Sequence, residues 1–302
     1  MAKAPPTLRG SIVPLVTPFD PDGAVDFAAL RKLIDHHVDA GSHGISVTGT
    51  TGEPGALTLA ERLRMIEVAA ETIGGRLPFV PGTGTHQLPE TIEITKKAQE
   101  AGADAALVIV PYYARPTQEG LYAWYSELAE AVDIPLLVYN IPARTGVEIA
   151  PETVGRLSRD VPQIIGMKEA SPDFAHANFV LRECGPEFLL FSGLEALCFP
   201  LLAIGGAGFI SVTANLVPRE IARMYEAFTA GDWDEARDLH YRLLDLNDVV
   251  LTETNPTAVK WLMSRTGEIG PTLRAPLAPL SEAGQRRVRA AAESWGLLDG
   301  AR

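Results

Sequence analysis

Short apolar runs alternate with segments of helical periodicity along the first 217 residues of the chain. The apolar runs have the length of strands and end at glycine, proline or threonine, which favours strands. Thr58 and Glu61 have the spacing of a capping box, which opens a helix. Strands are expected over residues 11–16, 44–48, 77–81, 105–110, 134–139, 163–168, 188–191 and 208–212. Helices are expected over residues 25–40, 58–74, 89–101, 118–132, 151–158, 174–184 and 194–204.

Eight strand-then-helix units dominate this pattern. Strands that alternate with helices pair in parallel, and eight such units close most simply into a (β/α)8 TIM barrel. After Val217 the pattern is helical only, through Trp295. We therefore predict an α/β fold with a barrel catalytic domain over residues 1–230 and a C-terminal all-helical extension over residues 231–302.

Active sites of such barrels lie at the C-terminal ends of the strands. Several polar side chains fall there: Thr50, Thr51, Glu53, Tyr112, Tyr113, Tyr139, Arg144 and Lys168. The glycines at 205, 206 and 208 precede a strand and belong to the opposite, structural face. The run Gly82–Gly84 follows a strand but is no dinucleotide fingerprint, so no nucleotide cofactor is expected.

Lys168 ends a run of buried character, unlike the other five lysines, which lie in a terminus or on helical patterns. Strand alternation places Ile164 and Gly166 on its side and Ile165 and Met167 on the other. We expect Gly166 to leave room beside the amine for a small molecule. Burial favours a neutral, nucleophilic amine, which forms a Schiff base with a ketone. The alternative is a strand-end lysine that reaches into solvent.

Three neighbouring features suit a Schiff-base site for a 2-oxo acid. Thr50 and Thr51 offer hydroxyls and backbone N–H groups at a tight turn, where a carboxylate could bind. Tyr139 ends the preceding strand, so its phenol could serve Lys168 as acid and base. Arg144 is a cation where a second carboxylate could bind. Each has an ordinary structural alternative, but their convergence on one face favours a site.

Composition narrows the remaining possibilities. The formal net charge of −12 argues against nucleic acid as a partner, and no apolar run is long enough to span a bilayer. No signal peptide is evident and the two cysteines form no disulfide framework, so a cytoplasmic protein is expected. His86 alone among six histidines lies near the active face, without partners spaced for a metal.

Several motifs resemble the dihydrodipicolinate synthase / N-acetylneuraminate lyase family over nearly the whole chain, from Gly10 to about Leu280. They are Gly49–Glu53, Pro111–Pro116, Tyr139–Gly146, Ile165–Ala170 and Asn255–Lys260. The resemblance implies a class I pyruvate-dependent lyase or aldolase that acts on pyruvate and an aldehyde. It also implies that no cofactor is needed, because the substrate forms a covalent imine.

The resemblance assigns roles by motif. Lys168 would form the Schiff base and Tyr139 would transfer protons, while Thr50 and Thr51 would bind the pyruvate carboxylate. Thr51 would also link Tyr139 to Tyr113, which would enter the site of a neighbouring subunit in a homotetramer built as a dimer of dimers. The substrate pocket would also include Gly193 and the backbone carbonyl of Ile210.

The subfamily is set by fewer residues. Arg144 matches the synthases of lysine biosynthesis, where it would hold the carboxylate of aspartate semialdehyde. Pro54 and Leu194 depart from those synthases, and Gly-Glu-Pro with Arg144 also resembles aldolases of aromatic-acid breakdown. The alternatives are therefore a 2,4-dihydroxyhept-2-enedioate or 2-oxo-3-deoxy sugar acid aldolase, or an idle protein that binds an oxo acid. Tyr112 and Glu90 match the site of lysine inhibition, whereas three other positions are replaced, namely Leu59, Arg62 and His86.

Overall fold

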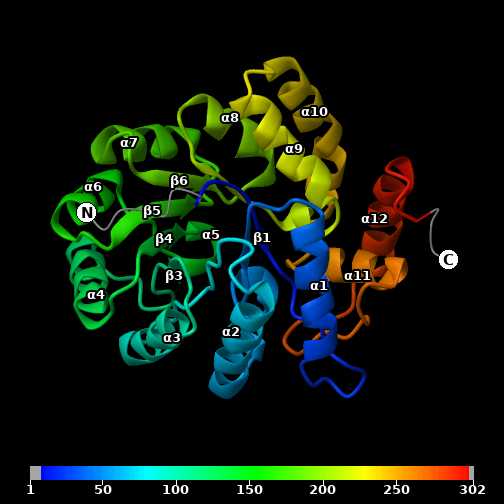
Figure 1. The fold of residues 1–302 in the computed structure, drawn as a ribbon, viewed down its shortest axis with the longest axis horizontal. Coiled ribbons are helices and arrows are strands. Elements are labelled where there is room, and N and C mark those ends of the chain that lie inside the picture. The colour runs from blue at the N-terminus through cyan, green and yellow to red at the C-terminus, as the bar shows by residue number, and fades with distance from the viewer. Residues whose placement is uncertain (1–7, 299–302) are drawn as a thin grey trace.

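The computed structural model describes residues 8–298, and its centre is a curled sheet of parallel strands (Figure 1). The strand order is β2-β1-β7-β6-β5-β4-β3, with every neighbouring pair parallel. The strands are β1 Gly10–Pro14, β2 Gly44–Ser46, β3 Ala106–Ile109, β4 Leu136–Asn140, β5 Ile164–Glu169, β6 Leu189–Ser192 and β7 Gly208–Ile210. The sequence predicted eight strands, and seven are present in the part of the chain that the structure describes.

The missing strand is the third, expected over residues 77–81. This segment still lies between β2 and β3 and closes the barrel. Phe79 forms a parallel bridge with Ile45, and Gly82 forms one with Leu107. Regular pairing fails because Pro81 has no N–H to donate toward β3, although its carbonyl accepts from Leu107 N at 2.9 Å. The eight-unit barrel is therefore complete, and residues 77–81 form its one irregular strand-like segment.

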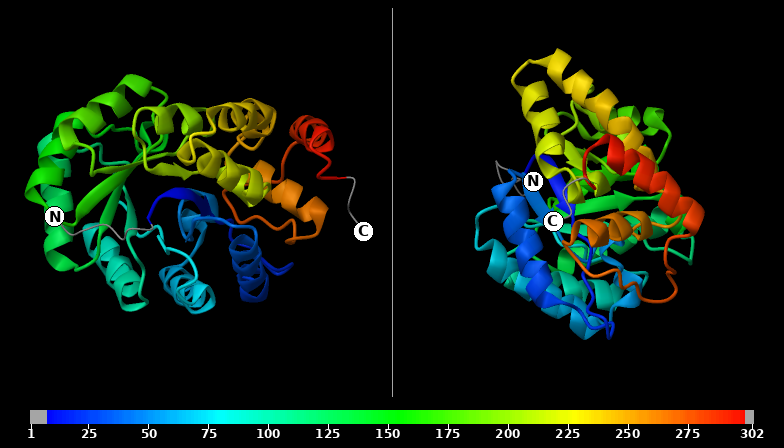
Figure 2. Two further views of the ribbon diagram at one scale, coloured as in Figure 1. Left: turned by 45° about the horizontal axis from the view of Figure 1, so that its top comes forward. Right: turned by 90° about the vertical axis from the view of Figure 1, so that its right-hand side faces the viewer.

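Helices surround the sheet in the predicted alternation (Figure 2). They are α1 Phe27–Asp39, α2 Leu59–Ile73, α3 Leu88–Glu100, α4 Gln118–Ala131, α5 Pro142–Thr145, α6 Pro151–Asp160, α7 Phe174–Cys184 and α8 Cys198–Ala203. The capping box of Thr58 and Glu61 is confirmed at the start of α2. The helix expected from residue 194 begins only at Cys198, which leaves Pro200 in the first turn, where no N–H is required.

The chain after Val217 is helical, as predicted. Its helices are α9 Pro218–Thr229, α10 Trp233–Val249, α11 Thr257–Thr266 and α12 Glu282–Ser294. Figure 1 shows α11 and α12 together beside the barrel, on the side of α1. Buried residues of α10, α11 and α12 share one hydrophobic core with β1, α1 and α2. The boundary at residue 230 stays a prediction. Within residues 8–298, no helix has the length and apolar character needed to cross a membrane.

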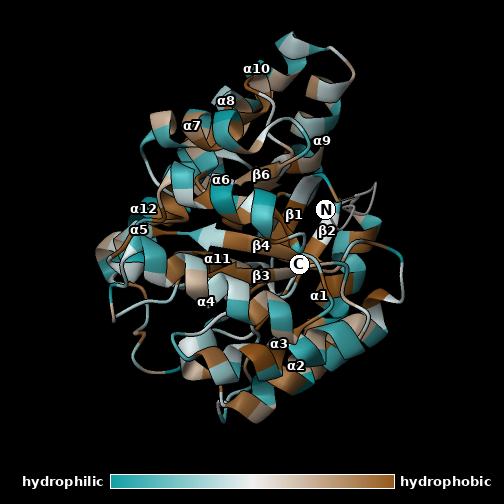
Figure 3. Ribbon diagram, turned by 90° about the vertical axis from the view of Figure 1, so that its left-hand side faces the viewer, coloured by the Kyte–Doolittle hydropathy of each residue, from teal (hydrophilic) through white to brown (hydrophobic). Residues whose placement is uncertain are grey.

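The barrel interior has its own small core, made of residues from every strand but β2 and from the closing segment. The strands are largely hydrophobic, whereas the helices turn hydrophilic faces outward (Figure 3). The interior residues include Ile12, Val80, Leu107, Leu137, Ile165, Leu189 and Ile210. Tyr139 belongs to the same cluster, so the barrel is filled by side chains and only its C-terminal end is available for a site.

The predicted alternation along the lysine strand is wrong at its start. Leu136 pairs with Ile164, but Leu137 pairs with Gly166, so Ile165 is an extra residue in a bulge. As a result Ile165 points into the barrel, while Ile164 joins Met167 in the outer core. The alternation holds from Met167 onward, and it places Lys168 on the inner face.

Candidate active site

Lys168 and Tyr139 form the centre of the candidate site. They are register partners on β5 and β4, and each is only 5% exposed. The Lys168 Nζ lies 4.5 Å from the centroid of the Tyr139 ring. The ion pairs between described residues do not include Lys168. This is a buried amine beside a phenol, so the solvent-reaching alternative for Lys168 is wrong.

A glycine makes space for the lysine, but it is not the predicted one. A side chain at Gly166 would lie 2.3 Å from the carbonyl oxygen of Leu189, so that position is filled by β6. A Cβ at Gly193 would lie 2.7 Å from the Lys168 Cε and 2.9 Å from the Ala170 Cβ. Gly193 therefore gives the lysine side chain its path, and its place in the substrate pocket stays a prediction.

The threonine turn follows β2 and forms a short 3₁₀ helix, Thr50–Gly52. Thr50 lines a small cavity together with Tyr139 and Tyr112. Thr51 is buried and does not line that cavity; its hydroxyl accepts a hydrogen bond from Asn255 Nδ2 at 3.0 Å. An accepting hydroxyl keeps its own proton free to donate. The two threonines are therefore placed differently, and only Thr50 shares a cavity with the phenol.

A buried ion pair supports the threonine turn from behind. Lys260 Nζ donates to Glu53 Oε1 at 2.6 Å, and both side chains are 1% exposed. Lys260 also lies over the Phe19 ring, 4.3 Å from its centroid. Burial lowers the pKa of Lys260, although Glu53 opposes that shift. The sequence placed Lys260 on a helical pattern and gave no prediction of this contact.

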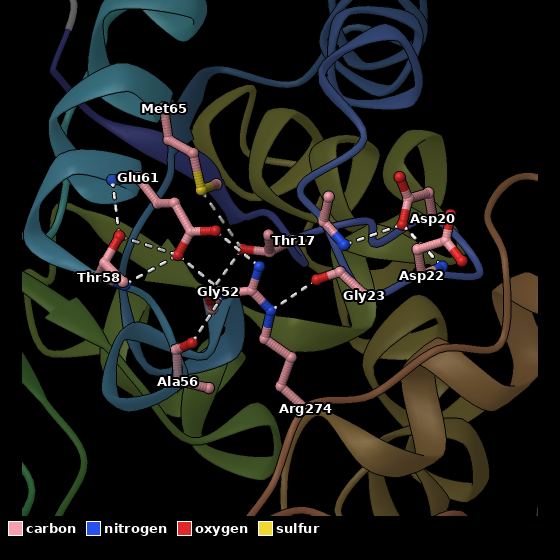
Figure 4. A network of polar contacts seen from close by, with 11 residues as sticks. Thr17, Asp20, Asp22, Gly23, Gly52, Ala56, Thr58, Glu61, Met65 and Arg274 are labelled. Carbon is pink, nitrogen blue, oxygen red and sulfur yellow. Dashed lines mark hydrogen bonds and ion pairs between the residues drawn. The ribbon is translucent and has the colours of Figure 1, made fainter.

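Arg274 forms a second group of polar contacts nearby, at the start of α2 (Figure 4). Its guanidinium donates to both carboxylate oxygens of Glu61 at 2.6 and 2.8 Å, and to the carbonyl oxygens of Ala56 and Gly23. These hydrogen bonds lower the pKa of Glu61 to about 2. The segment after α11 thus binds the loop at Ala56, which lies between the threonine turn and α2, and the start of α2.

Arg144 and Tyr113 lie at the rim. Arg144 is exposed on α5, after β4, and its Nη2 lies 3.5 Å from the carbonyl oxygen of Asn255. Tyr113 is 91% exposed and has φ of +73°, a conformation that is costly for a side chain of this size. Within one chain the structure does not bring Tyr113 to Thr51 or Tyr139. Ile210 is buried in the barrel interior at the end of β7.

Comparison with known proteins places this site in a family. Residues 7–294 match the model of the dihydrodipicolinate synthetase family. The 4-hydroxy-tetrahydrodipicolinate synthase of Thermus thermophilus is 50% identical over 291 residues, covering 96% of this chain and 97% of that protein. The chain belongs to the dihydrodipicolinate synthetase family. The predicted family is thereby confirmed, and with it the class of pyruvate-dependent aldolases.

Solved structures of the family agree with the fold. The crystal structure of dihydrodipicolinate synthase from Aquifex aeolicus is 40% identical and superposes with a TM-score of 0.94, covering 96% of this chain and 99% of its own. A second structure, described as the first monomeric dihydrodipicolinate synthase variant, is 34% identical with the same TM-score. It covers 97% of this chain and 98% of its own. The predicted TIM barrel is confirmed.

The wall beyond Gly193 departs from the pattern expected for a synthase of this family. Leu194 packs against the interior cluster, and Glu195 is buried and accepts a hydrogen bond from Val212 N at 2.7 Å. Burial raises the pKa of Glu195, while the hydrogen bond from the Val212 N–H opposes that shift. Glu195 was not singled out from the sequence, yet it joins the segments that follow β6 and β7.

Proposed function

We propose that this protein is a 4-hydroxy-tetrahydrodipicolinate synthase that condenses pyruvate with aspartate semialdehyde. The observation that carries the proposal is the buried Lys168 amine against Tyr139, with no carboxylate of residues 8–298 ion-paired to it, in a chain that is 50% identical to a synthase of that name. The amine attacks the keto carbon of pyruvate and water leaves, which forms an imine. Loss of a methyl proton gives an enamine, whose carbon adds to the aldehyde.

The surrounding residues take the remaining roles in this proposal. Tyr139 transfers protons to and from the imine, because its phenol ends the neighbouring strand. Thr50 and Thr51 bind the pyruvate carboxylate, and Arg144 binds the carboxylate of the aldehyde substrate. No cofactor is required, because the covalent imine itself activates the substrate.

A second candidate is an aldolase that cleaves 2,4-dihydroxyhept-2-enedioate. Leu194 packs against the interior cluster beside Gly193, so the wall near the imine is apolar. Such a wall suits an aldehyde that carries a carboxylate and no amino group. Arg144 would hold the carboxylate of either aldehyde. The aldehyde substrates of the two candidate enzymes differ only in the amino group.

We propose a homotetramer for the assembly. Tyr113 supports it, because a large side chain that projects from the rim with strained backbone suits insertion into a neighbouring subunit. Light scattering on the purified protein tests the mass, and Tyr113→Ala should weaken activity if the neighbour's tyrosine completes the site. A monomer with full activity would contradict this assembly. We propose the cytoplasm as the location of the protein.

The decisive experiment is turnover of pyruvate with aspartate semialdehyde, coupled to a dipicolinate reductase that oxidises a nicotinamide cofactor. We expect turnover that is lost in Lys168→Ala, together with pyruvate trapped on Lys168 by borohydride. Trapping without turnover would refute the synthase and retain the imine chemistry. Cleavage of 2,4-dihydroxyhept-2-enedioate would then be measured. The absence of trapping would refute both candidates.

A further inference from the structure

Four buried residues form a closed circuit of polar contacts on the outer side of β4 and β5. Asn140 Nδ2 donates to Glu169 Oε1 at 3.0 Å, and Glu169 Oε2 lies 2.7 Å from His176 Nδ1. His176 Nε2 lies 2.8 Å from the carbonyl oxygen of Ile149, whose N–H donates back to Asn140 Oδ1 at 3.3 Å. Each of the four residues is at most 5% exposed. We refer to these four residues as the strand-end circuit.

The contacts of the ring favour a protonated histidine. Both ring nitrogens of His176 face acceptors, a carboxylate and a backbone carbonyl, and a neutral imidazole can donate to only one of them. Glu169 of β5 and Glu148 of the loop before α6 act on the charge of the ring, and both favour the imidazolium. These contacts outweigh burial and raise the pKa of His176 to about 9.

The circuit joins the parts of the site that meet the two substrates. Asn140 and Glu169 directly follow Tyr139 and Lys168, so they fix the ends of the two strands that carry the central pair. Ile149 ends the loop after β4 that carries Arg144. Breaking the circuit would remove the anchor of this loop at Ile149, while Arg115 and Gln118 still hold Gly146 and Glu148 and the ladder between β4 and β5 is kept.

We propose that protonated His176 is a positioning residue that fixes the Arg144 loop relative to Lys168. This inference rests on the proposed function, because it assigns Arg144 to the aldehyde carboxylate. It implies that His176 acts on the aldehyde half of the reaction and leaves imine formation with pyruvate unchanged. No contact of His176 with either substrate is involved.

The test compares His176→Gln with His240→Gln, since His240 is a second buried histidine that forms no ion pair among the described residues. We expect His176→Gln to raise the KM for the aldehyde roughly tenfold, which corresponds to about 1.4 kcal/mol. Deuterium uptake over residues 141–149 should rise as well, while borohydride trapping of pyruvate stays at the wild-type level. His240→Gln should change none of these three quantities.

A folded His176→Gln with wild-type KM and wild-type loop exchange would overturn the inference. If that variant does not fold, Glu169→Gln carries the same expectation, because it keeps the contact with Asn140 and removes the charge. The wild-type protein gives a third measurement. Loop exchange, corrected for its intrinsic pH dependence, should rise between pH 8 and about pH 10, and a constant value would refute the role of the imidazolium. Loss of trapping in the wild type would instead refute the proposed function.

Discussion

Two buried ion pairs stand behind the two halves of the candidate site, and they differ in how fully their polar atoms are satisfied. Glu53 and Lys260 lie behind the threonine turn, where Glu53 accepts one hydrogen bond, from Lys260, and one oxygen of each pair's carboxylate is without a hydrogen bond among the described residues. Glu169 and His176 lie behind the lysine strand, where Glu169 also accepts from Asn140 and from Ser171 N at 2.6 Å. One is an isolated pair and the other belongs to a network.

This difference has energetic consequences. Removing two charges from water costs several kcal/mol per ion, and an isolated pair recovers that cost only through mutual attraction. The lowered pKa of Lys260 is the sign that burial outweighs the attraction of Glu53. In the second pair the pKa of His176 is raised, because its contacts outweigh burial. Burial therefore disfavours the charged form of Lys260, whereas the contacts of His176 favour its charged form.

The largest effect is expected from breaking the isolated pair. Lys260→Met leaves Glu53 buried without the cation that hydrogen-bonds to it, so we expect the free energy of unfolding to fall by about 3–5 kcal/mol. Urea denaturation measures this loss. The matched control is the double variant Glu53→Gln with Lys260→Met, which removes both charges and should recover most of the stability. Equal losses in the single and double variants would contradict the assignment to an unpaired charge.

A smaller effect is expected from breaking the network. His176→Gln should lower the free energy of unfolding by about 1–3 kcal/mol, the cost of unsatisfied buried groups, because Glu169 keeps its donors from Asn140 and Ser171. The same urea titration measures it, with His240→Gln as the reference for losing a buried imidazole. A loss as large as that of Lys260→Met would remove the distinction between the two pairs.

The two pairs also show which parts of the site could be predicted from the sequence and which could not. Lys168 could be found because it ends an apolar strand, and strand ends carry the chemistry of a barrel. Lys260 was missed, although apolar residues flank it on both sides from Ala258 to Met263, a pattern that indicates a fully buried helix. The contact of Glu169 with His176 had no such signal, because it depends on how α7 docks against the end of β5.

The backbone irregularities show the same contrast between features that have a signal in the sequence and features that have none. The prolines at 78 and 81 stood in the expected third strand and gave a reason to doubt its regular pairing. The bulge at Ile165 had no sequence signal, because it arises from the offset between β4 and β5. The path of Lys168 past Gly193 likewise depends on a glycine on a neighbouring strand's loop, whereas reasoning along one strand pointed to Gly166.

The finest test of the comparison is the pH dependence of stability, which should have opposite signs for the two pairs. The pKa of His176 is raised from 6.5 to about 9, so its contribution is fully present below pH 6.5 and is lost as the pH rises to about 9. The pKa of Lys260 is lowered from 10.5, so the folded protein binds a proton at this amine less strongly than the unfolded chain does. The resulting loss of stability becomes smaller as the pH approaches 10.5.

We therefore expect the stability advantage of the wild type over His176→Gln to shrink between pH 6.5 and 9. The advantage over Lys260→Met should not shrink across the same range, because the folded lysine resists protonation rather than requiring it. Urea titrations of the three proteins at matched ionic strength measure both differences. A constant advantage over His176→Gln would mean that the imidazole is neutral in the folded protein, and the strand-end circuit would then have only one donor at the ring.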